Sequence, residues 1–151
     1  MRKQCAYIFD LDMTLCDCSH RLHFITGEHK DWDAFYDACL DDAPIHDVIK
    51  ILNIIEWRAA KAIFLTGRPE ICRLNTDNWI INYTGIETGK ENLFMRKDGD
   101  HRPDYIVKRE IYEQEIKDKY DVIGVFEDRD SCVKMWRELG LTCFQVADGS
   151  Y

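Results

Sequence analysis

The sequence predicts an α/β fold in three layers, with a parallel sheet covered by helices on both faces. Short apolar runs that suit buried strands alternate along the chain with longer segments whose apolar residues recur at helical spacing. At 151 residues, of which 46% are hydrophobic and 32% charged, the chain is long enough for one domain with a substantial core. No repeat or Pro/Gly-rich linker divides it, so residues 1–151 are expected to form a single domain.

The first half of the chain is expected to begin with a strand at residues 6–9 and a helix at about 31–40. Pro44 suits the first turn of a second helix, because the N–H that proline lacks would be unpaired there. The apolar residues of this helix recur at helical spacing and predict one buried face: Ile45, Val48, Ile49, Leu52 and Ile55. A second buried strand at 60–65 and a helix at about 69–83 complete this half.

The second half continues the alternation of strands and helices. Its expected elements are a strand at 92–95, a helix at about 103–120, a strand at 122–126, a helix that ends near Gly140 and a strand at 143–147. Trp57, Trp79 and Trp136 occupy apolar helical positions and are expected in the core. Ile71 and Leu74 are expected to supply apolar positions to the helix at 69–83.

Polar residues follow three of the expected strands. Asp10 and Asp12 follow the first strand, residues 66–68 (Thr-Gly-Arg) follow the second, and residues 127–128 (Glu-Asp) follow the strand at 122–126. Ligands of parallel sheets bind beyond the carboxyl ends of the strands. If these strands are neighbours, two acid pairs, a hydroxyl and cations surround one cavity, which Lys108 joins from the preceding helix.

This mixture of groups suits magnesium-dependent phosphoryl transfer. A carboxylate nucleophile and a phosphate repel each other, so a divalent cation must bridge them. Magnesium prefers hard oxygen ligands, which one or two carboxylates and a carbonyl provide. Cations and hydroxyls then stabilise the charge on the transferring oxygens. The alternative is that acids at these positions only cap turns or helix starts, which we retain for Asp130.

Charge and cysteine content restrict the binding partners and the cellular compartment that we expect for this protein. The net charge of −8 argues against broad binding to duplex nucleic acid, although a local basic pocket could still hold a nucleic-acid end. No apolar stretch approaches the roughly 20 residues of a membrane span, and no cleavable leader is visible. The seven cysteines show no CxxC pair, so we expect reduced thiols and a cytoplasmic protein, with Cys72 and Cys132 in the core.

The chain resembles the haloacid dehalogenase superfamily of phosphohydrolases at four positions. Residues 10–14 (Asp-Leu-Asp-Met-Thr) are similar to its first motif, Thr66 to its second, Lys108 to its third and residues 127–128 to its fourth. Met13 departs from the family, which often has glycine there, and Glu127 stands where an Asp pair is common. The resemblance implies a Rossmann-like sheet with a small or minimal cap, which residues 19–44 are expected to form.

A narrower resemblance covers roughly 55 positions of the C-terminal half, including non-catalytic ones that a shared fold alone would not produce. The 3′-phosphatase domain of phage-type polynucleotide kinase–phosphatase is similar at these positions: residues 95–100, Arg102, Asp104, residues 107–108, 127–129 and 135–137, Gly140 and residues 145–147. No GxxxxGK[ST] phosphate-binding loop of a kinase is present in the sequence. We therefore expect a free-standing phosphatase domain, acting in the cytoplasm of a cell or of a phage's host, with no membrane contact.

The resemblance implies a catalytic role for four residues. Asp10 would attack phosphorus and form an aspartyl-phosphate. Asp12 would donate a proton to the leaving 3′ oxygen and later take one from the attacking water. Thr66 would hydrogen-bond a phosphoryl oxygen, and Lys108 would neutralise the nucleophile and the phosphoryl group. Arg109 is a direct rival of Lys108 in the sequence, and only the resemblance favours Lys108.

The resemblance also implies the binding residues. Mg²⁺ would be held by Asp10, by the backbone carbonyl of Asp12 and by Asp128, with Glu127 in an outer role. Beside this metal site, we expect a second phosphate clamp at Arg68, whose planar fork suits phosphate oxygens. Arg21 is expected on the leaving side of the substrate.

The substrate that these expectations favour is the 3′-phosphate at a nucleic-acid end, removed as a healing step in repair. A nucleotidase or another small-molecule phosphatase is the alternative within enzymes. A non-catalytic interaction module is the alternative outside them, and the set of acids speaks against it, because an idle site would not need them. The segment between the first two motifs is short, which favours an open site that a polymer end can enter. Within it, Trp32 and Phe35 are candidates for stacking on a base.

Overall fold

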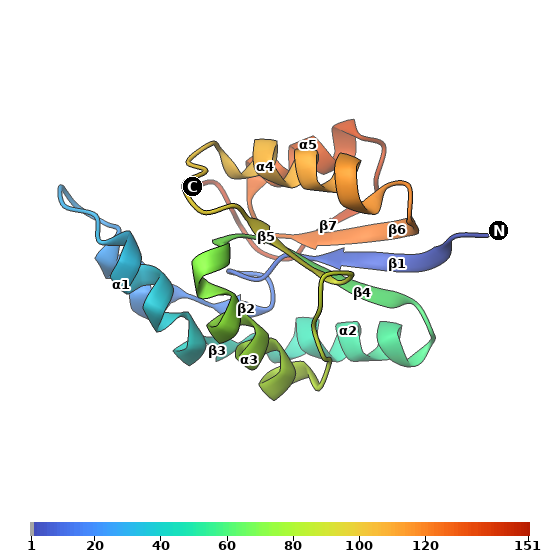
Figure 1. Cartoon of the computed structure of the whole chain (residues 1–151), viewed down its shortest axis with the longest axis horizontal. Helices are drawn as coiled ribbons and strands as arrows, with labels where there is room; N and C mark the ends of the chain where they lie inside the picture. Colours follow the sequence, from blue (N-terminus) through green and yellow to red (C-terminus); the bar gives the residue numbers. More distant parts are fainter. Residues whose placement is uncertain (1) are drawn as a thin grey trace.

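A computed structural model describes residues 2–151 and has a five-stranded parallel sheet at its centre, in the order β5-β4-β1-β6-β7 (Figure 1). The predicted α/β fold is therefore confirmed. In chain order, the strands of this sheet are β1 (Gln4–Phe9), β4 (Lys61–Pro69), β5 (Leu93–Arg96), β6 (Tyr120–Glu127) and β7 (Cys143–Gln145). The strands β4, β1 and β6, whose ends carry the polar motifs, are direct neighbours.

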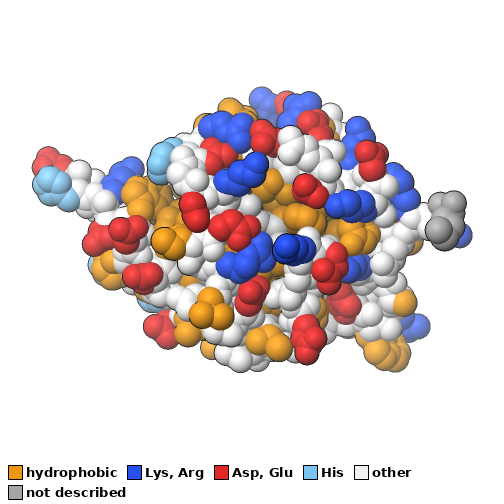
Figure 2. Space-filling model, in the orientation of Figure 1, with side chains coloured by type: hydrophobic (Ala, Val, Ile, Leu, Met, Phe, Trp, Pro, Cys, Tyr) orange, Lys and Arg blue, Asp and Glu red, His pale blue; other side chains and the backbone are white. Residues whose placement is uncertain are grey.

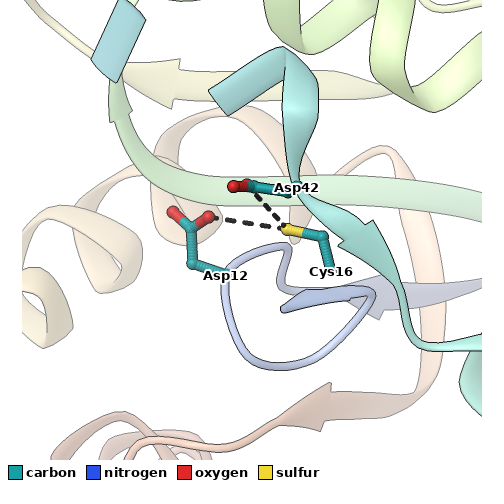
Figure 3. A group of neighbouring side chains, drawn as sticks. All are labelled: Asp12, Cys16 and Asp42. Atoms are coloured by element: carbon teal, nitrogen blue, oxygen red, sulfur yellow. Dashed lines mark hydrogen bonds between the residues drawn. The ribbon is translucent and has the colours of Figure 1, made fainter. Parts of the chain in front are cut away.

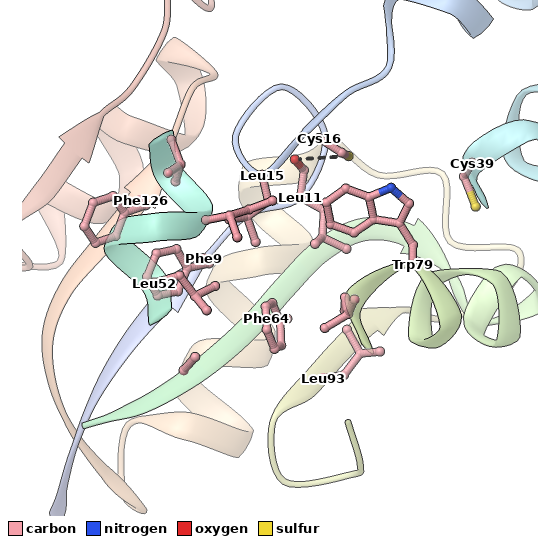
Figure 4. Close-up of a cluster of buried hydrophobic side chains, with 14 of the residues drawn as sticks. Phe9, Leu11, Leu15, Cys16, Cys39, Leu52, Phe64, Trp79, Leu93 and Phe126 are labelled. Atoms are coloured by element: carbon pink, nitrogen blue, oxygen red, sulfur yellow. Dashed lines mark hydrogen bonds between the residues drawn. The ribbon is translucent and has the colours of Figure 1, made fainter. Parts of the chain in front are cut away.

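Helices cover both faces of the sheet (Figure 1). On one face lie α2 (His46–Trp57) and α3 (Arg73–Thr84); on the other lie α4 (Asp104–Ile111), which continues as one π-helical turn to Ile116, and α5 (Asp130–Glu138). Figure 4 shows Phe9, Leu52, Phe64 and Trp79 packed between the sheet and the first pair of helices. The neighbouring Ile8 belongs to a second hydrophobic cluster on the other face of the sheet, because side chains alternate between the two faces along a strand.

The segment expected to form a cap lies beside the carboxyl ends of the strands (Figure 1). It consists of short elements: β2 (Cys16–Asp17), the 3₁₀ helix η1 (Ser19–Phe24), α1 (Trp32–Asp37), the 3₁₀ helix η2 (Ala38–Asp41) and β3 (Ala43–Pro44). β2 and β3 pair in antiparallel fashion and close the segment at its base. The helix expected at 31–40 is therefore divided into one α-helical and one 3₁₀ part, and the function of the segment as a cap stays a prediction.

Three apolar residues expected at buried helical positions are exposed. Trp57 is 77% exposed because it ends α2, away from the face formed by Val48, Ile49 and Leu52. Ile71 is exposed because it lies in a short 3₁₀ helix (η3, Glu70–Cys72), whose three residues per turn break the assumed α-helical register. Leu74 is exposed on the first turn of α3, whose buried residues are Thr76, Trp79 and Ile80.

Other expectations about the core are confirmed. Trp79 and Trp136 are completely buried, and so is Cys132, while Cys72 is nearly so. All seven cysteines are free thiols. The helix expected at 103–120 ends earlier, at Ile116, and β6 begins at Tyr120. Within residues 2–151, no helix has the length and apolar character that crossing a membrane requires.

Candidate active site

The expected site residues come together at the carboxyl edge of the sheet. Asp10 directly follows β1, and its backbone N–H donates to the carbonyl of Phe126 in β6 at 3.0 Å. This bond fixes Asp10 beside Glu127 and Asp128, where β6 ends. Thr66 lies in β4 on the other side of β1, because this strand is longer than expected and continues to Pro69.

Lys108 reaches the same edge from α4 and connects the two acid pairs. Its ammonium group donates to Asp10 Oδ1 at 2.7 Å and to Glu127 Oε2 at 2.8 Å, and it lies 3.5 Å from Asp104 Oδ2. The Lys108 side chain is almost completely buried. Burial would lower the pKa of Lys108, but the charges of Asp10 and Glu127 raise it well above its ordinary value. The residue is therefore a permanent cation beside the expected nucleophile.

Asp10 and Asp128 share a hydroxyl partner and an unfavourable charge. Thr14 Oγ1 lies 3.1 Å from Asp10 Oδ2 and 3.2 Å from Asp128 Oδ1. Burial and the charge of Glu127 raise the pKa of Asp10 to about 7. Burial and the charge of Asp10 raise the pKa of Asp128 to about 6. Each carboxylate is thus held where ionisation is costly, even though Lys108 lies beside Asp10.

The same acids form a group that fits a divalent metal. One oxygen each from Asp10, Glu127 and Asp128 lies within 4.8 Å of the others, and all three residues are buried. Carboxylate oxygens at the end of a strand are the ligands that Mg²⁺ prefers. Lys108 engages one oxygen of both Asp10 and Glu127, but the other oxygen of Glu127 also accepts from the backbone N–H groups of Asp128 and Arg129, at 3.2 and 3.4 Å. Asp10 and Asp128 are therefore the more available pair. The Tyr151 hydroxyl donates a hydrogen bond to Asp128 Oδ2, whereas Thr14 lies next to Asp128 Oδ1.

Asp12 faces a different environment, made by two arginines. Arg68 Nη2 donates to Asp12 Oδ1 at 2.6 Å, and Arg21 Nη2 donates to the same oxygen at 2.5 Å. Burial would raise the pKa of Asp12, but the charges of Arg68 and Arg21 outweigh it and hold that pKa far below its usual value. Asp12 is therefore a fixed carboxylate, whereas Asp10, two residues earlier, holds its proton close to neutral pH.

Asp12, Cys16 and Asp42 form a second acidic group (Figure 3). Asp42 is completely buried and binds both arginines, at 2.7 Å from Arg21 Nε and 2.7 Å from Arg68 Nη2. The two guanidinium groups neutralise the two carboxylates, so this group needs no cation, in contrast to the one at Asp10.

Arg21 and Arg68, expected to contact substrate, are both buried in the structure. Arg21 also donates to the backbone carbonyl of Phe35 at 3.2 Å, and Arg68 to Thr76 Oγ1 at 3.3 Å. Their described contacts orient Asp12, while a role on the phosphate stays a prediction. The Thr66 hydroxyl accepts a hydrogen bond from the backbone N–H of Arg68 at 3.2 Å, which leaves its own proton available.

Backbone geometry explains why glycine would suit the position of Met13. This residue has φ of 64°, in the left-handed region that glycine adopts without steric cost. The turn after β1 thus keeps the conformation of a glycine turn despite the side chain. Gly67 has a different constraint, since a Cβ there would lie 2.0 Å from Asp104 Oδ1.

Sequence reasoning missed several residues of this site. Asp104 binds Arg96 at 2.9 Å and lies one helical turn before Lys108, a spacing of four that could have identified it. Thr14 lay within the first motif but received no role. Asp42 had no signal in the sequence, because only the pairing of β2 with β3 carries it to the arginines.

The chain is similar to known proteins in sequence and in fold. A family model described as "Polynucleotide kinase PNKP phosphatase domain" matches residues 4–151. A putative bifunctional polynucleotide kinase/RNA ligase of Autographa californica nuclear polyhedrosis virus is 36% identical over 137 residues, which cover 87% of this chain and 19% of that protein. The chain thus spans about a fifth of the length of this curated relative.

Solved structures show the same fold. The chain has a TM-score of 0.80 and 32% identity to a chain in the structure of the Pnkp1/Rnl/Hen1 RNA repair complex, covering 99% of this chain and 44% of that one. The tungstate-bound class C acid phosphatase from Bacillus anthracis has a TM-score of 0.75 at 15% identity, with 100% of this chain and 69% of that one covered. At this identity the second likeness concerns the fold alone.

Proposed function

We propose, since this chain belongs to the family of polynucleotide kinase PNKP phosphatase domains, that it removes the 3′-phosphate from polynucleotide ends through an aspartyl-phosphate. The observation that carries the proposal is the contrast between Asp10 and Asp12. Two carboxylates one residue apart are held by different cations, Lys108 for one and an arginine pair for the other. Environments that separate the pKa values of neighbouring acids are typical of sites that divide nucleophilic and proton-transfer roles.

In the first step, an Asp10 oxygen attacks phosphorus and the bond from phosphorus to the 3′ oxygen breaks. The leaving 3′ oxygen takes a proton from Asp12, which must therefore be protonated at that moment. In the second step, water attacks the phosphorus of the aspartyl-phosphate and gives a proton to Asp12. The bond from phosphorus to the Asp10 oxygen breaks, which regenerates the Asp10 carboxylate and releases inorganic phosphate. Lys108 stays bound to Asp10 and Glu127 and holds the nucleophile in place.

The arginines determine when Asp12 can carry a proton. In the free site they keep it ionised. A phosphate dianion held at Asp10 would bring negative charge near Asp12 and oppose the effect of the two buried arginines. Substrate binding would then raise the pKa of Asp12 and enable it to protonate the leaving oxygen.

Asp10, Asp128 and the backbone carbonyl of Asp12 would hold Mg²⁺, with Glu127 outside the inner ligands because Lys108 and two backbone N–H groups engage both of its oxygens. When bound, the metal would screen the charge of the nucleophile from that of the phosphate. Thr66 would add a hydrogen bond to a phosphoryl oxygen. All seven cysteines are free thiols, which supports a reducing compartment such as the cytoplasm.

Magnesium should raise the melting temperature more at about pH 8 than at about pH 5. Because the pKa values of Asp10 and Asp128 are raised in the folded state, the metal-free protein loses stability as pH rises from the ordinary carboxyl range towards about 7 and about 6, respectively. A cation reverses this loss where both groups are ionised, and at lower pH it must displace protons. At 100-fold excess over Kd, we expect an increase on the order of 5 to 10 °C at the higher pH. Differential scanning calorimetry with Mg²⁺ and with chelator measures it.

Two variants complete this test. Asp128→Asn should lose the magnesium-dependent increase, whereas Asp47→Asn, at an exposed position of α2, should keep it. An equal increase at both pH values, or one that persists in Asp128→Asn, would contradict the assignment of the metal to these acids.

The proposed substrate is tested by phosphate release from a panel of phosphomonoesters, with magnesium and with chelator. The panel contains 3′-phosphorylated DNA and RNA oligonucleotides, the same oligonucleotides phosphorylated at the 5′ end, and 3′-mononucleotides. Both nucleic acids are included because the viral relative is named for RNA ligation and the solved complex for RNA repair. We expect magnesium-dependent release from the 3′-phosphorylated oligonucleotides at a higher kcat/KM than from the other substrates.

Other outcomes of the panel would change the proposal. Release from mononucleotides alone would indicate a nucleotidase, and equal release from 5′ and 3′ ends would remove the end specificity. No release from any substrate would contradict the proposed function while leaving the fold and family unchanged.

A further inference from the structure

The catalytic groups account for the phosphoryl group but not for the nucleoside that carries it. The element nearest to the site without an assigned role is α1, which stands beside the carboxyl ends of the strands (Figure 1). Hydrophobic side chains are visible over this segment at the left of Figure 2, with acidic side chains around them. Three aromatic residues of α1 pack on one another: Trp32, Phe35 and Tyr36.

Contacts of Arg21 fix α1 to the catalytic site. The guanidinium group that holds Asp12 lies 4.1 Å from the centre of the Phe35 ring and donates to the Phe35 carbonyl. Tyr36 is half-buried on the adjacent side. Burial raises the pKa of Tyr36 to about 12.

Trp32 continues this aromatic surface away from the site. Its ring stacks on that of Tyr36, with centres 5.9 Å apart and planes 26° apart, and meets Phe35 edge-on at 5.8 Å. Trp32 lies four residues before Tyr36, which is about 6 Å along the helix axis. Trp32 nevertheless stays 46% exposed, so part of its ring is accessible.

A shallow, open depression of about 480 Å³ is lined by His29, Lys30, Asp31, Trp32 and Asp33. Its rim mixes donors and carboxylate acceptors around one large ring. A nucleobase has donors and acceptors on its edge and a flat π-face, and it carries no charge. This rim therefore fits a base better than a bare phosphate, which Asp31 and Asp33 would repel.

We propose that the accessible part of the Trp32 ring, supported from behind by Tyr36, stacks on a nucleobase close to the 3′ end of the substrate. This inference rests on the proposed function, because it places the base relative to a phosphate held at Asp10. The stack gives the site a preference for polynucleotide ends over small phosphomonoesters. A base–aromatic stack is tolerant of sequence, so the preference would not depend strongly on which base is present.

The test compares Trp32→Ala and Trp32→Phe with a matched control, Trp57→Ala, which removes another exposed tryptophan from α2, on the lower side of the sheet in Figure 1. For a 3′-phosphorylated oligonucleotide, Trp32→Ala should raise KM about 10-fold with little change in kcat. Trp32→Phe should recover most of the loss, because it restores a π-face. With p-nitrophenyl phosphate, which has no nucleobase, all three variants should resemble the parent protein.

A thermodynamic cycle isolates the stack itself. Affinity is measured by fluorescence anisotropy in the Asp10→Asn background, with oligonucleotides that carry either a normal or an abasic nucleoside at each of the last two positions. Loss of a base should weaken binding about 10-fold with Trp32 present and hardly at all in Trp32→Ala. Equal sensitivity to base removal with and without Trp32 would overturn the inference.

The outcomes separate this inference from the proposed function. If the parent protein releases no phosphate from 3′-phosphorylated oligonucleotides, the proposed function fails. If it does release phosphate, but Trp32→Ala leaves KM unchanged or impairs p-nitrophenyl phosphate equally, the function stands and the stacking site is refuted. An effect of Trp57→Ala as large as that of Trp32→Ala would also refute it.

Discussion

Asp10→Asn should abolish turnover of 3′-phosphorylated oligonucleotides, with kcat reduced by about 10³-fold or more, as for removal of other catalytic nucleophiles. The amide cannot attack phosphorus, whereas its oxygen can still accept the hydrogen bond from Lys108. The substitution also removes a charge that repels Glu127 and Asp128. We therefore expect thermal stability in the absence of metal to be equal to or above that of the parent protein, as measured by calorimetry beside steady-state phosphate release.

Asp47→Asn is the matched control, because it makes the same chemical change at a side chain that is 93% exposed. It should leave both kcat and stability unchanged. Retention of full activity by Asp10→Asn would rule out the covalent mechanism. Loss of activity together with loss of folding would leave Asp10 with a structural role only.

Lys108→Ala should reduce both activity and stability. Lys108 contacts Asp10 and Glu127 and lies close to Asp104, so its removal leaves three buried acids without this cation. Breaking a buried ion pair costs about 3–5 kcal/mol, which corresponds to a decrease in melting temperature on the order of 10 °C for a chain of this size. The pKa of Asp10 should rise further, since Lys108 lowers it, and less of the nucleophile would be ionised near neutral pH. We expect kcat to fall by about 10²-fold or more.

Arg109→Ala supplies the control for Lys108→Ala. Arg109 is the neighbouring cation in the sequence, but its side chain is 53% exposed and pairs with Glu113, at 3.1 Å, one turn away on the surface. Such pairs contribute about 0–1 kcal/mol. Activity and melting temperature should therefore stay close to those of the parent protein. Equal losses in the two variants would invalidate the distinction between these residues.

The sequence was sufficient to predict the strands that build the site. The apolar runs before Asp10 and Glu127 are short and bounded by polar residues, and the rule for parallel sheets then brings their carboxyl ends together. The order of the strands could not follow from these patterns alone. That order places β1 between β4 and β6, and it depends on contacts between residues far apart in the chain.

The environment of Asp12 was beyond sequence reasoning for a physical reason. Its two arginine partners come from separate elements, Arg21 from η1 and Arg68 from β4. The burial of both arginines depends on Asp42, which neutralises them from the end of the cap segment. A surface arginine and a buried arginine look identical in a sequence. Likewise, Trp57 had the spacing of a core residue but lies where α2 ends, with the guanidinium group of Arg58 over its ring and 77% of its surface exposed.

Acid-quench trapping of the phosphoryl group tests the central claim most directly. The protein is mixed with an oligonucleotide that carries a ³²P-labelled 3′-phosphate and quenched in acid within one turnover, and the label on the protein is then mapped by peptide mass spectrometry. We expect label on the Asp10 side chain in the parent protein and no label in Asp10→Asn. Phosphate release without any labelled protein, or label on another residue, would contradict it.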